Sequence, residues 1–274
     1  MINENVLHKS ADSFQFEKKS LKFVSNSTNL IYEFERSNRS YILRFSERPL
    51  ECVNGIKAEI EWLDYLKKNG VSVSQPIKTK NEEFLSVIQD DGRTYIVTAF
   101  EKAQGVAIDE KDDNIWNAYL FQRWGQTMGK IHSLSKKYKI ADKKVKRGEW
   151  DEGGIYAPDL HLNSYDLVIE KWWSLLSDLR NLSKDKDSYG LIHNDFHHYN
   201  FLLDKDKINV FDFDDSVYGW FISDIAIALY HAVWWGAPEK KHEREGFAKK
   251  FLDSFMEGYS KENSIIGLSN YLFS

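Results

Sequence analysis

The stretch that decides the fold is residues 191–215, LIHNDFHHYNFLLDKDKINVFDFDD. It begins with the spacing His-x-Asp-x4-Asn and closes with Asp-Phe-Asp. Between these two motifs, short apolar runs at 201–203 and 208–211 flank a polar turn at 204–207. Apolar runs on either side of such a turn are typical of a β-hairpin. We therefore expect the polar residues before and after the hairpin to meet at one end of it.

The expected pairing of the hairpin brings three oxygen-bearing side chains together. If Leu203 pairs near Ile208, Asn200 and Asp212 lie side by side, and Asp195 lies on the loop that leads into the hairpin. Hard oxygen ligands of this kind select Mg²⁺, usually with phosphate groups as further ligands. This is the layout of a phosphoryl-transfer site, where an Asp orients the attacking hydroxyl while an Asn and another Asp hold metal ions on the nucleotide.

The segment resembles the catalytic segment of the aminoglycoside phosphotransferase and choline kinase-like family, which has the protein-kinase-like fold. In that family an HxDxxxxN loop is followed by a hydrophobic hairpin and an Asp-x-Asp. The resemblance implies that Asp195 is the catalytic base and that Asn200 and Asp212 bind the metal. It also implies that His193 holds the loop by hydrogen bonds. Asp214 and Asp215 are candidates for the lining of the metal site or of the acceptor pocket, and we interpret Asp214 as an acid just outside the metal site.

Three other residues near the segment have more than one interpretation. Asp224, in the run SDIA at a predicted helix start, matches a family aspartate that braces the catalytic loop from behind. A carboxylate in the first turn of a helix is also favoured by the helix itself, so a purely local role stays open. His197 and His198 could be metal ligands. We favour the alternative that they pack and form hydrogen bonds in the loop, because adjacent residues seldom point at one ion.

The pattern of the first 100 residues predicts mostly short strands and one helix. Ile56, Ile60, Leu63 and Leu66 recur at helical spacing, and Asn69-Gly70 supplies a stop after them. We expect an antiparallel sheet with this one helix after its third strand. The expected strands are 21–24, 30–34, 41–45, 84–89 and 94–100, and the expected helix is 53–68.

Two charged residues of this part are candidates for the nucleotide site. Residues 41–45 resemble the third strand of the family, where a Lys or Arg faces the nucleotide phosphates, and here that residue is Arg44. Glu59 falls within the apolar stripe of the helix, where an unpaired carboxylate is unfavourable, so we expect it to pair with Arg44. Arg is a planar fork rather than a point charge, so its reach to the phosphates differs from that of Lys. A solvated position at the helix edge is the alternative for Glu59.

The resemblance also implies nucleotide contacts at two other segments. The turn within 23–34 lies where the family covers the phosphates; it has no glycine, and Ser27 is the candidate there. Residues 100–105 resemble the connection between the two lobes. The backbone C=O of Glu101 and the N–H of Ala103 would bind the adenine edge.

After residue 105 the pattern becomes helical, with apolar stripes at 116–131, 167–179, 225–235 and 247–259. We therefore expect an α+β, bilobal, protein-kinase-like fold. Residues 1–102 form a small β-rich, nucleotide-binding N-lobe, an antiparallel sheet with one helix. Residues 103–274 form a larger, mainly α-helical C-lobe that carries catalysis and acceptor binding.

Composition narrows the class of protein further. The 274 residues are 42% hydrophobic and 15% aromatic, which is far too apolar for a disordered chain. The single cysteine excludes an internal disulfide and any CxxC zinc site. No apolar run approaches the ~20 residues needed to span a bilayer, and no signal peptide is visible. We expect a cytoplasmic protein that does not bind membranes.

Charge is distributed unevenly along the chain. Residues 1–147 have a net charge of +5 and residues 148–274 a net charge of −10, which together give −5. An acidic half argues against a nucleic-acid partner, which requires a basic face. It mildly favours a cationic acceptor, although charged residues that only solvate the surface are an equally simple interpretation.

Taken with the resemblance, these features imply a Mg²⁺-dependent kinase that uses ATP or GTP to phosphorylate a hydroxyl of a small molecule. We expect a monomer or dimer. A protein Ser/Thr kinase of the stress-response kinase branch and a non-catalytic pseudokinase are the alternatives, although pseudokinases usually lose one of Asp195, Asn200 and Asp212. Candidate acceptor contacts are residues 143–158 and 218–237. We interpret the following aromatic residues as core or rim rather than as ligand platforms: Tyr199, Trp220, Trp234 and Trp235.

Overall fold

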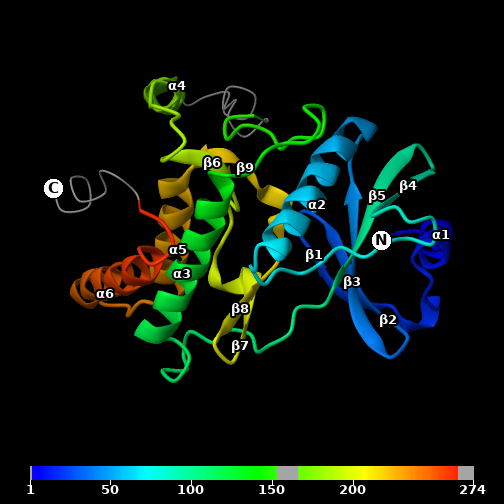
Figure 1. Cartoon of the computed structure of the whole chain (residues 1–274), viewed down its shortest axis with the longest axis horizontal. Helices are drawn as coiled ribbons and strands as arrows, with labels where there is room; N and C mark the ends of the chain where they lie inside the picture. The colour runs from blue at the N-terminus through cyan, green and yellow to red at the C-terminus, as the bar shows by residue number, and fades with distance from the viewer. Residues whose placement is uncertain (1, 153–165, 265–274) are drawn as a thin grey trace.

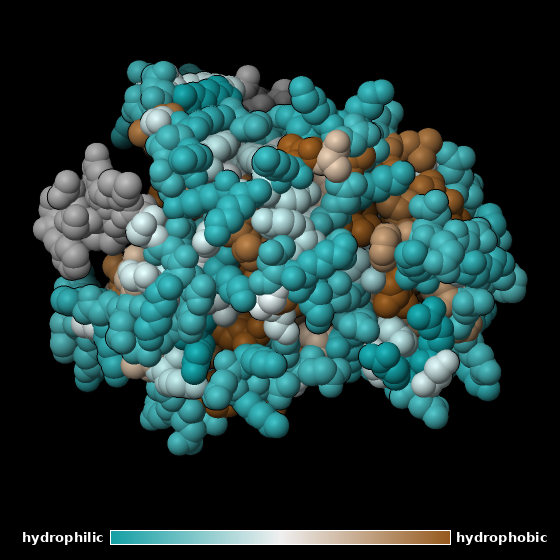
Figure 2. Space-filling model, in the orientation of Figure 1, coloured by the Kyte–Doolittle hydropathy of each residue, from teal (hydrophilic) through white to brown (hydrophobic). Residues whose placement is uncertain are grey.

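The computed structural model describes residues 2–152 and 166–264. It has two parts, a β-sheet built from the first half of the chain and a mainly helical part built from the second, with helix α2 between them (Figure 1). The face shown in Figure 2 is mostly hydrophilic, and hydrophobic residues reach it only in small patches. Many large apolar side chains are buried in the clusters that form the cores of the two parts.

The first part is an antiparallel sheet with the strand order β1-β2-β3-β5-β4. The expected helix is α2 (Val53–Lys68), which follows β3 as predicted. In the register of the sheet, Arg44 of β3 lies opposite Thr98 of β5 and Ile31 of β2. The strands are β1 (Lys22–Asn26), β2 (Leu30–Arg36), β3 (Arg39–Glu47), β4 (Leu85–Asp90) and β5 (Arg93–Glu101).

A helix that the sequence did not predict, α1 (Glu4–Phe14), covers the outer face of this sheet (Figure 1). Val6 and Phe14 of α1 are fully buried in the same cluster as Val97 of β5. The neighbouring Ile96 points to the other face and packs with α2. Because successive side chains of a strand alternate between faces, both faces of the sheet are covered and the expectation of one helix in this part was wrong.

The second part is built around helix α3, whose buried face includes Trp124 and Met128. Two short two-stranded sheets, β6 with β9 and β7 with β8, lie beside it. The helices are α3 (Ala118–Ser135), α4 (Asp166–Arg180), α5 (Phe221–Gly236) and α6 (Lys241–Tyr259). The strands are β6 (Tyr189–Ile192), β7 (Phe201–Asp204), β8 (Lys207–Val210) and β9 (Val217–Trp220).

Helices α3 and α6 cross with their backbones in direct contact. A Cβ atom added to Gly125 would lie 1.9 Å from the carbonyl oxygen of Phe255. One added to Gly258 would lie 1.8 Å from the carbonyl oxygen of Gln122. Both distances are far below any van der Waals contact, so this crossing requires glycine on each helix. The contact fixes α6 against the helix that supports the rest of the second part.

The connection between the parts is short. Strand β5 ends at Glu101, and by Val106 the chain already exchanges backbone hydrogen bonds with Leu203 of β7. Because the backbone leaves the sheet at Glu101 and pairs with β7 at Val106, we propose the lobe boundary between residues 102 and 103. In the described ranges, no helix has the length and apolar character that crossing a membrane requires.

Candidate active site

The predicted hairpin is present, with the predicted register. Strands β7 and β8 pair with Leu203 opposite Ile208. The backbone N–H of Phe211 then donates to the carbonyl oxygen of Asn200 at 3.0 Å. Asn200 and Asp212 consequently meet at one end of the hairpin, as the sequence indicated, and both line the same cavity.

This cavity, of about 370 Å³, lies between the sheet and the hairpin. Its wall is largely apolar, with a few charged and amide groups, which is the usual character of a cofactor pocket. Five of the predicted site residues line it: Arg44, Glu59, Ala103, Asn200 and Asp212. The remaining lining residues are Val24, Ser25, Ile31, Ile42, Leu63, Ser74, Phe100, Lys102, Tyr199, Leu202, Phe211 and Phe213.

The orientation of Asn200 suits a metal ligand. Its amide nitrogen donates to both the carbonyl oxygen (2.8 Å) and the carboxylate (2.9 Å) of Asp195, which leaves the amide oxygen available. The Asp212 carboxylate has no hydrogen-bond partner among the described residues, and desolvation by the surrounding protein raises its pKa. An accessible, unpartnered carboxylate beside a free amide oxygen fits a hard divalent cation such as Mg²⁺.

His193 ties the catalytic loop to the end of the hairpin. Its ring is fully buried; Nδ1 accepts the backbone N–H of Asp195 at 3.4 Å, and Nε2 lies 3.1 Å from the carbonyl oxygen of Phe211. These two contacts are satisfied together when Nε2 carries the proton and donates it. The loop-holding hydrogen bonds expected of His193 are thus present.

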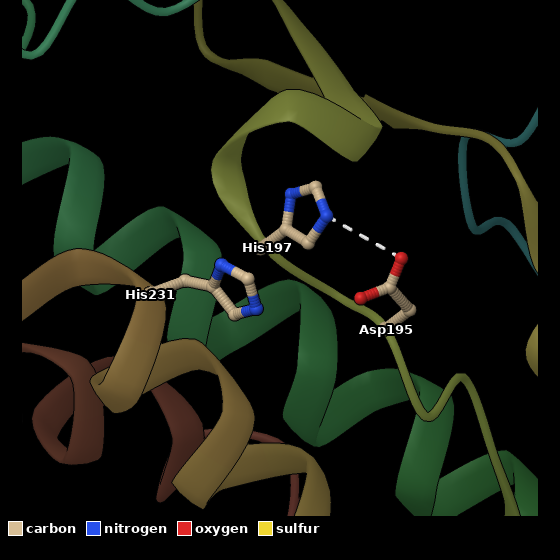
Figure 3. A group of neighbouring side chains, drawn as sticks. All are labelled: Asp195, His197 and His231. Carbon is tan, nitrogen blue, oxygen red and sulfur yellow. Dashed lines mark ion pairs between the residues drawn. The ribbon is translucent and has the colours of Figure 1, made fainter. Parts of the chain in front are cut away.

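A neighbouring histidine holds Asp195 by a hydrogen bond. His197 accepts the backbone N–H of Tyr199 at Nδ1 (3.2 Å), so its proton lies on Nε2, 3.3 Å from the Asp195 carboxylate. Figure 3 shows this contact, with His231 of α5 beside it. Burial acts to raise the pKa of Asp195, but the hydrogen bonds from His197 and Asn200 outweigh it and hold that pKa below its usual range. Asp195 is therefore ionised and able to orient a hydroxyl.

Asp224 braces the loop from behind. Its buried carboxylate accepts the backbone N–H groups of His193 (2.9 Å) and Asn194 (2.6 Å). Asn194 has a φ of 66°, a left-handed conformation that an L-residue adopts only when its surroundings hold it there. These contacts reach well beyond the helix that carries Asp224, so its role is not purely local.

A buried hydrogen-bond chain extends from Asp224 across the helical part, and sequence reasoning missed it. His132 of α3 lies 3.0 Å from the Asp224 carboxylate through Nε2, and 2.9 Å from the Tyr259 hydroxyl through Nδ1. Asn263 donates to the same hydroxyl at 2.7 Å. Every group is satisfied if Tyr259 donates to Nδ1 and Nε2–H donates to Asp224. No local sequence pattern marks partners so far apart in the chain.

Arg44 and Glu59 form the buried pair that the sequence predicted. Two parallel hydrogen bonds of 2.8 and 2.7 Å join the guanidinium to the carboxylate, so the solvated position considered for Glu59 is wrong. Burial disfavours the charge of Arg44, but Glu59 outweighs this effect and raises the pKa of the guanidinium. The Nε of Arg44 is buried and has no hydrogen-bond partner within the described residues. Arg44 also lines the cavity, so its positive charge lies at the cavity wall.

Asp214 joins the two parts of the molecule. It accepts hydrogen bonds from Asn29 (2.8 Å) and from Arg48 Nη1 (3.2 Å), and Arg44 lies 3.8 Å away. Burial opposes its charge, but Arg44 and Arg48 outweigh the burial and lower the pKa of Asp214. Asn29 also accepts the Ser46 hydroxyl at 2.7 Å. Asn29 and Arg48 were not singled out from the sequence, because nothing local predicts that β1–β2 and β3 reach Asp214.

The remaining predicted contacts are less clearly placed. Ser27 is exposed in the turn between β1 and β2 and is not among the residues that line the cavity, whereas Val24 and Ser25 are. Ala103 lines the cavity but Glu101 does not. Of the candidate acceptor loop at 143–158, residues 153–158 lie outside the described part of the chain.

Comparison with known proteins identifies the family. The sequence model of the phosphotransferase enzyme family matches residues 20–262. The chain belongs to this family. Amicoumacin kinase of Bacillus subtilis (strain 168) is 35% identical over 268 residues, which cover 96% of this chain and 77% of that kinase. The resemblance drawn from the catalytic segment is thereby confirmed, and the protein is a small-molecule phosphotransferase.

Solved structures of the family have the same fold. The structure of amicoumacin kinase hAmiN in complex with AMP-PNP, Ca²⁺ and Ami has a TM-score of 0.88 and 33% identity, covering 96% of this chain and 79% of that one. A microcompartment-associated aminopropanol kinase has a TM-score of 0.72 at 19% identity, covering 97% of this chain and 82% of that one, and shares the fold alone. The predicted α+β, protein-kinase-like fold class is confirmed.

Proposed function

We propose that this phosphotransferase moves the γ-phosphate of ATP to a hydroxyl of a small acceptor, with Mg²⁺ held by Asn200 and Asp212. The observation that carries the proposal is the convergence, at one cavity, of the Arg44–Glu59 pair from the sheet with the two oxygen ligands from the hairpin. A related kinase binds AMP-PNP and Ca²⁺, which supports ATP over GTP and a divalent metal in this role.

In this proposal each residue acts on the nucleotide or the hydroxyl. Asp195 orients the attacking hydroxyl and accepts its proton, for which its lowered pKa keeps it ionised. Arg44, which Glu59 holds in place, contributes its positive charge to the phosphate end of the cavity. Mg²⁺, when bound, neutralises the charge that develops on the phosphates. The backbone of Glu101 and Ala103 binds the adenine edge, and Ser27 lies over the phosphate end.

We propose a cationic acceptor and take amicoumacin as the first to test, because a kinase of that name is the relative with 35% identity. The acidic second half of the chain supports a cation, with a net charge of −10 over residues 148–274. Near the catalytic loop, Tyr199 donates to Glu110 at 3.4 Å, which places a carboxylate there. We further propose a cytoplasmic monomer or dimer with no nucleic-acid partner, since ATP is a cytoplasmic metabolite and the acidic half disfavours nucleic acid.

The decisive test is ADP release in the presence of Mg·ATP and a panel of amicoumacin and small amino alcohols. Asp195→Asn keeps the shape of the loop but removes the base, so we expect turnover to fall by roughly 10²–10⁴-fold. Binding of Mg·ATP, followed by thermal shift, should persist in this variant and be lost in Asp212→Asn. Asp64→Asn, an exposed change on α2, is the matched control. Undiminished phosphorylation by Asp195→Asn would refute the assignment.

A further inference from the structure

Four large aromatic side chains are exposed near the catalytic loop. Tyr230, Trp234 and Trp235 of α5 have exposed fractions of 59%, 65% and 50%, and Tyr199, which follows the loop, is 47% exposed. Among the large hydrophobic residues that the structure describes, Trp234 is the most exposed. Single exposed apolar residues need no explanation, but a contiguous group of them marks a binding surface. Tyr199, Trp234 and Trp235 are therefore rim rather than core residues.

These four side chains, called here the α5 aromatic face, form one surface. The rings of Tyr230 and Trp234 are stacked, with centroids 5.9 Å apart and an interplanar angle of 21°. Tyr199 meets Trp235 edge-on, at 6.1 Å between centroids. Because residues three and four apart share a face of a helix, Tyr230, Trp234 and Trp235 lie on the same side of α5 as His231.

The α5 aromatic face adjoins the catalytic carboxylate. His231 packs against His197 with ring centroids 4.5 Å apart, and its ring nitrogen lies within 4.8 Å of the Asp195 carboxylate (Figure 3). On the other side, Tyr199 lines the cavity assigned to the nucleotide. An acceptor whose hydroxyl reaches Asp195 beside that nucleotide would therefore lie along this face.

We infer that the phosphate acceptor is an aromatic alcohol whose ring packs on the α5 aromatic face while its hydroxyl reaches Asp195. This inference rests on the proposed function. This surface should bind an aromatic ring better than an aliphatic group. Stacked or edge-on contacts of a ring with Tyr and Trp contribute binding free energy in addition to that gained from the buried area. The Glu110 carboxylate at the Tyr199 hydroxyl suits an amine on the same molecule.

The test uses two acceptors that differ only in the group next to the hydroxyl. These are 2-amino-1-phenylethanol and 1-amino-2-propanol, which carry a phenyl ring and a methyl group on otherwise the same amino alcohol. For the unmodified enzyme we expect kcat/KM to be at least about tenfold higher for the phenyl compound. Trp234→Ala should reduce this ratio about tenfold, chiefly through KM of the acceptor. Trp173→Ala, which removes an exposed tryptophan of α4, should leave the ratio unchanged.

The outcomes separate this inference from the proposed function. ADP release with equal kcat/KM for both compounds, or a ratio unaffected by Trp234→Ala, would overturn the inference and leave the kinase assignment intact. If neither compound is phosphorylated, saturation-transfer NMR of the phenyl protons decides. Binding that is lost in Trp234→Ala supports the inference, and absence of binding overturns it. A dimer in light scattering that Trp234→Ala dissociates would assign the face to a second copy of the chain and also overturn it.

Discussion

Replacing Asp224 by Asn tests how the catalytic loop is held. The carboxylate accepts three hydrogen bonds, from the backbone N–H groups of His193 and Asn194 and from His132. An amide of the same shape has one oxygen and places an NH₂ group against at least one of these donors. The variant thus loses charge-assisted bonds and leaves a buried donor unpaired.

The expected loss of stability follows from these three hydrogen bonds. Hydrogen bonds to charged groups contribute about 1.5–3 kcal/mol each, and breaking a buried charged network costs about 3–5 kcal/mol. We expect Asp224→Asn to lower the free energy of unfolding by about 3–5 kcal/mol, or on the order of 10 °C in Tm. Turnover should fall about 10²-fold because Asp195 lies on the displaced loop, and a misplacement of about 1 Å has such an effect.

The assays are urea unfolding and ADP release at saturating ATP, with Glu243→Gln as the matched control. Glu243 is also an acid in the first helical turn, of α6, but it is exposed. Replacing Glu243 should lower the free energy of unfolding by no more than about 1 kcal/mol, which is the ordinary contribution of such a charge at a helix start. Equal effects of the two substitutions would refute the bracing role and reduce Asp224 to a helix-end charge.

Three further predictions concern pairing, packing and pH. Glu59→Gln should lower stability by about 3–5 kcal/mol in denaturant unfolding, because the buried Arg44 charge loses its partner; a loss below about 1 kcal/mol would contradict the pairing. Gly125→Ala should lower Tm sharply, because the added Cβ would collide with the backbone of α6. Gly246→Ala, at an open position of α6, should instead raise the free energy of unfolding by about 0.5–1 kcal/mol. Similar effects of the two substitutions would disprove the close contact between α3 and α6. Burial raises the pKa of Tyr138 to about 12 from 10, so the unfolded state loses this proton first, and stability should fall between pH 10 and 12. Since the hydroxyl is only half-buried, the loss should be about 1 kcal/mol, and chemical unfolding of Tyr138→Phe over this range should show a flatter pH curve.

The parts of the site that the sequence predicted are those fixed by neighbouring residues. A polar turn between two apolar runs determines the β7–β8 register, and the register alone places Asn200 beside Asp212. Helical spacing places Glu59 on the buried face of α2, where the energetic penalty of a lone carboxylate requires a cation such as Arg44.

The parts that were missed depend on contacts between distant segments. Asn29 is 185 residues from Asp214 along the chain, and only the docking of the sheet on the helical part brings them together. Helix α1 escaped notice because Val6 and Phe14 are its only large fully buried side chains in a largely polar segment. Helical periodicity places Trp234 away from the buried Ile225 and Ala232 of α5, but it does not tell what the exposed side of the helix contacts.

The ties at Asp214 limit how the enzyme opens for nucleotide exchange. Asn29 and Arg48 belong to the part built on the sheet, whereas Asp214 follows the hairpin in the chain. If the lobes separated at this edge, the buried Asp214 carboxylate would lose its hydrogen-bond donors. Opening of the enzyme at this edge is therefore energetically unfavourable.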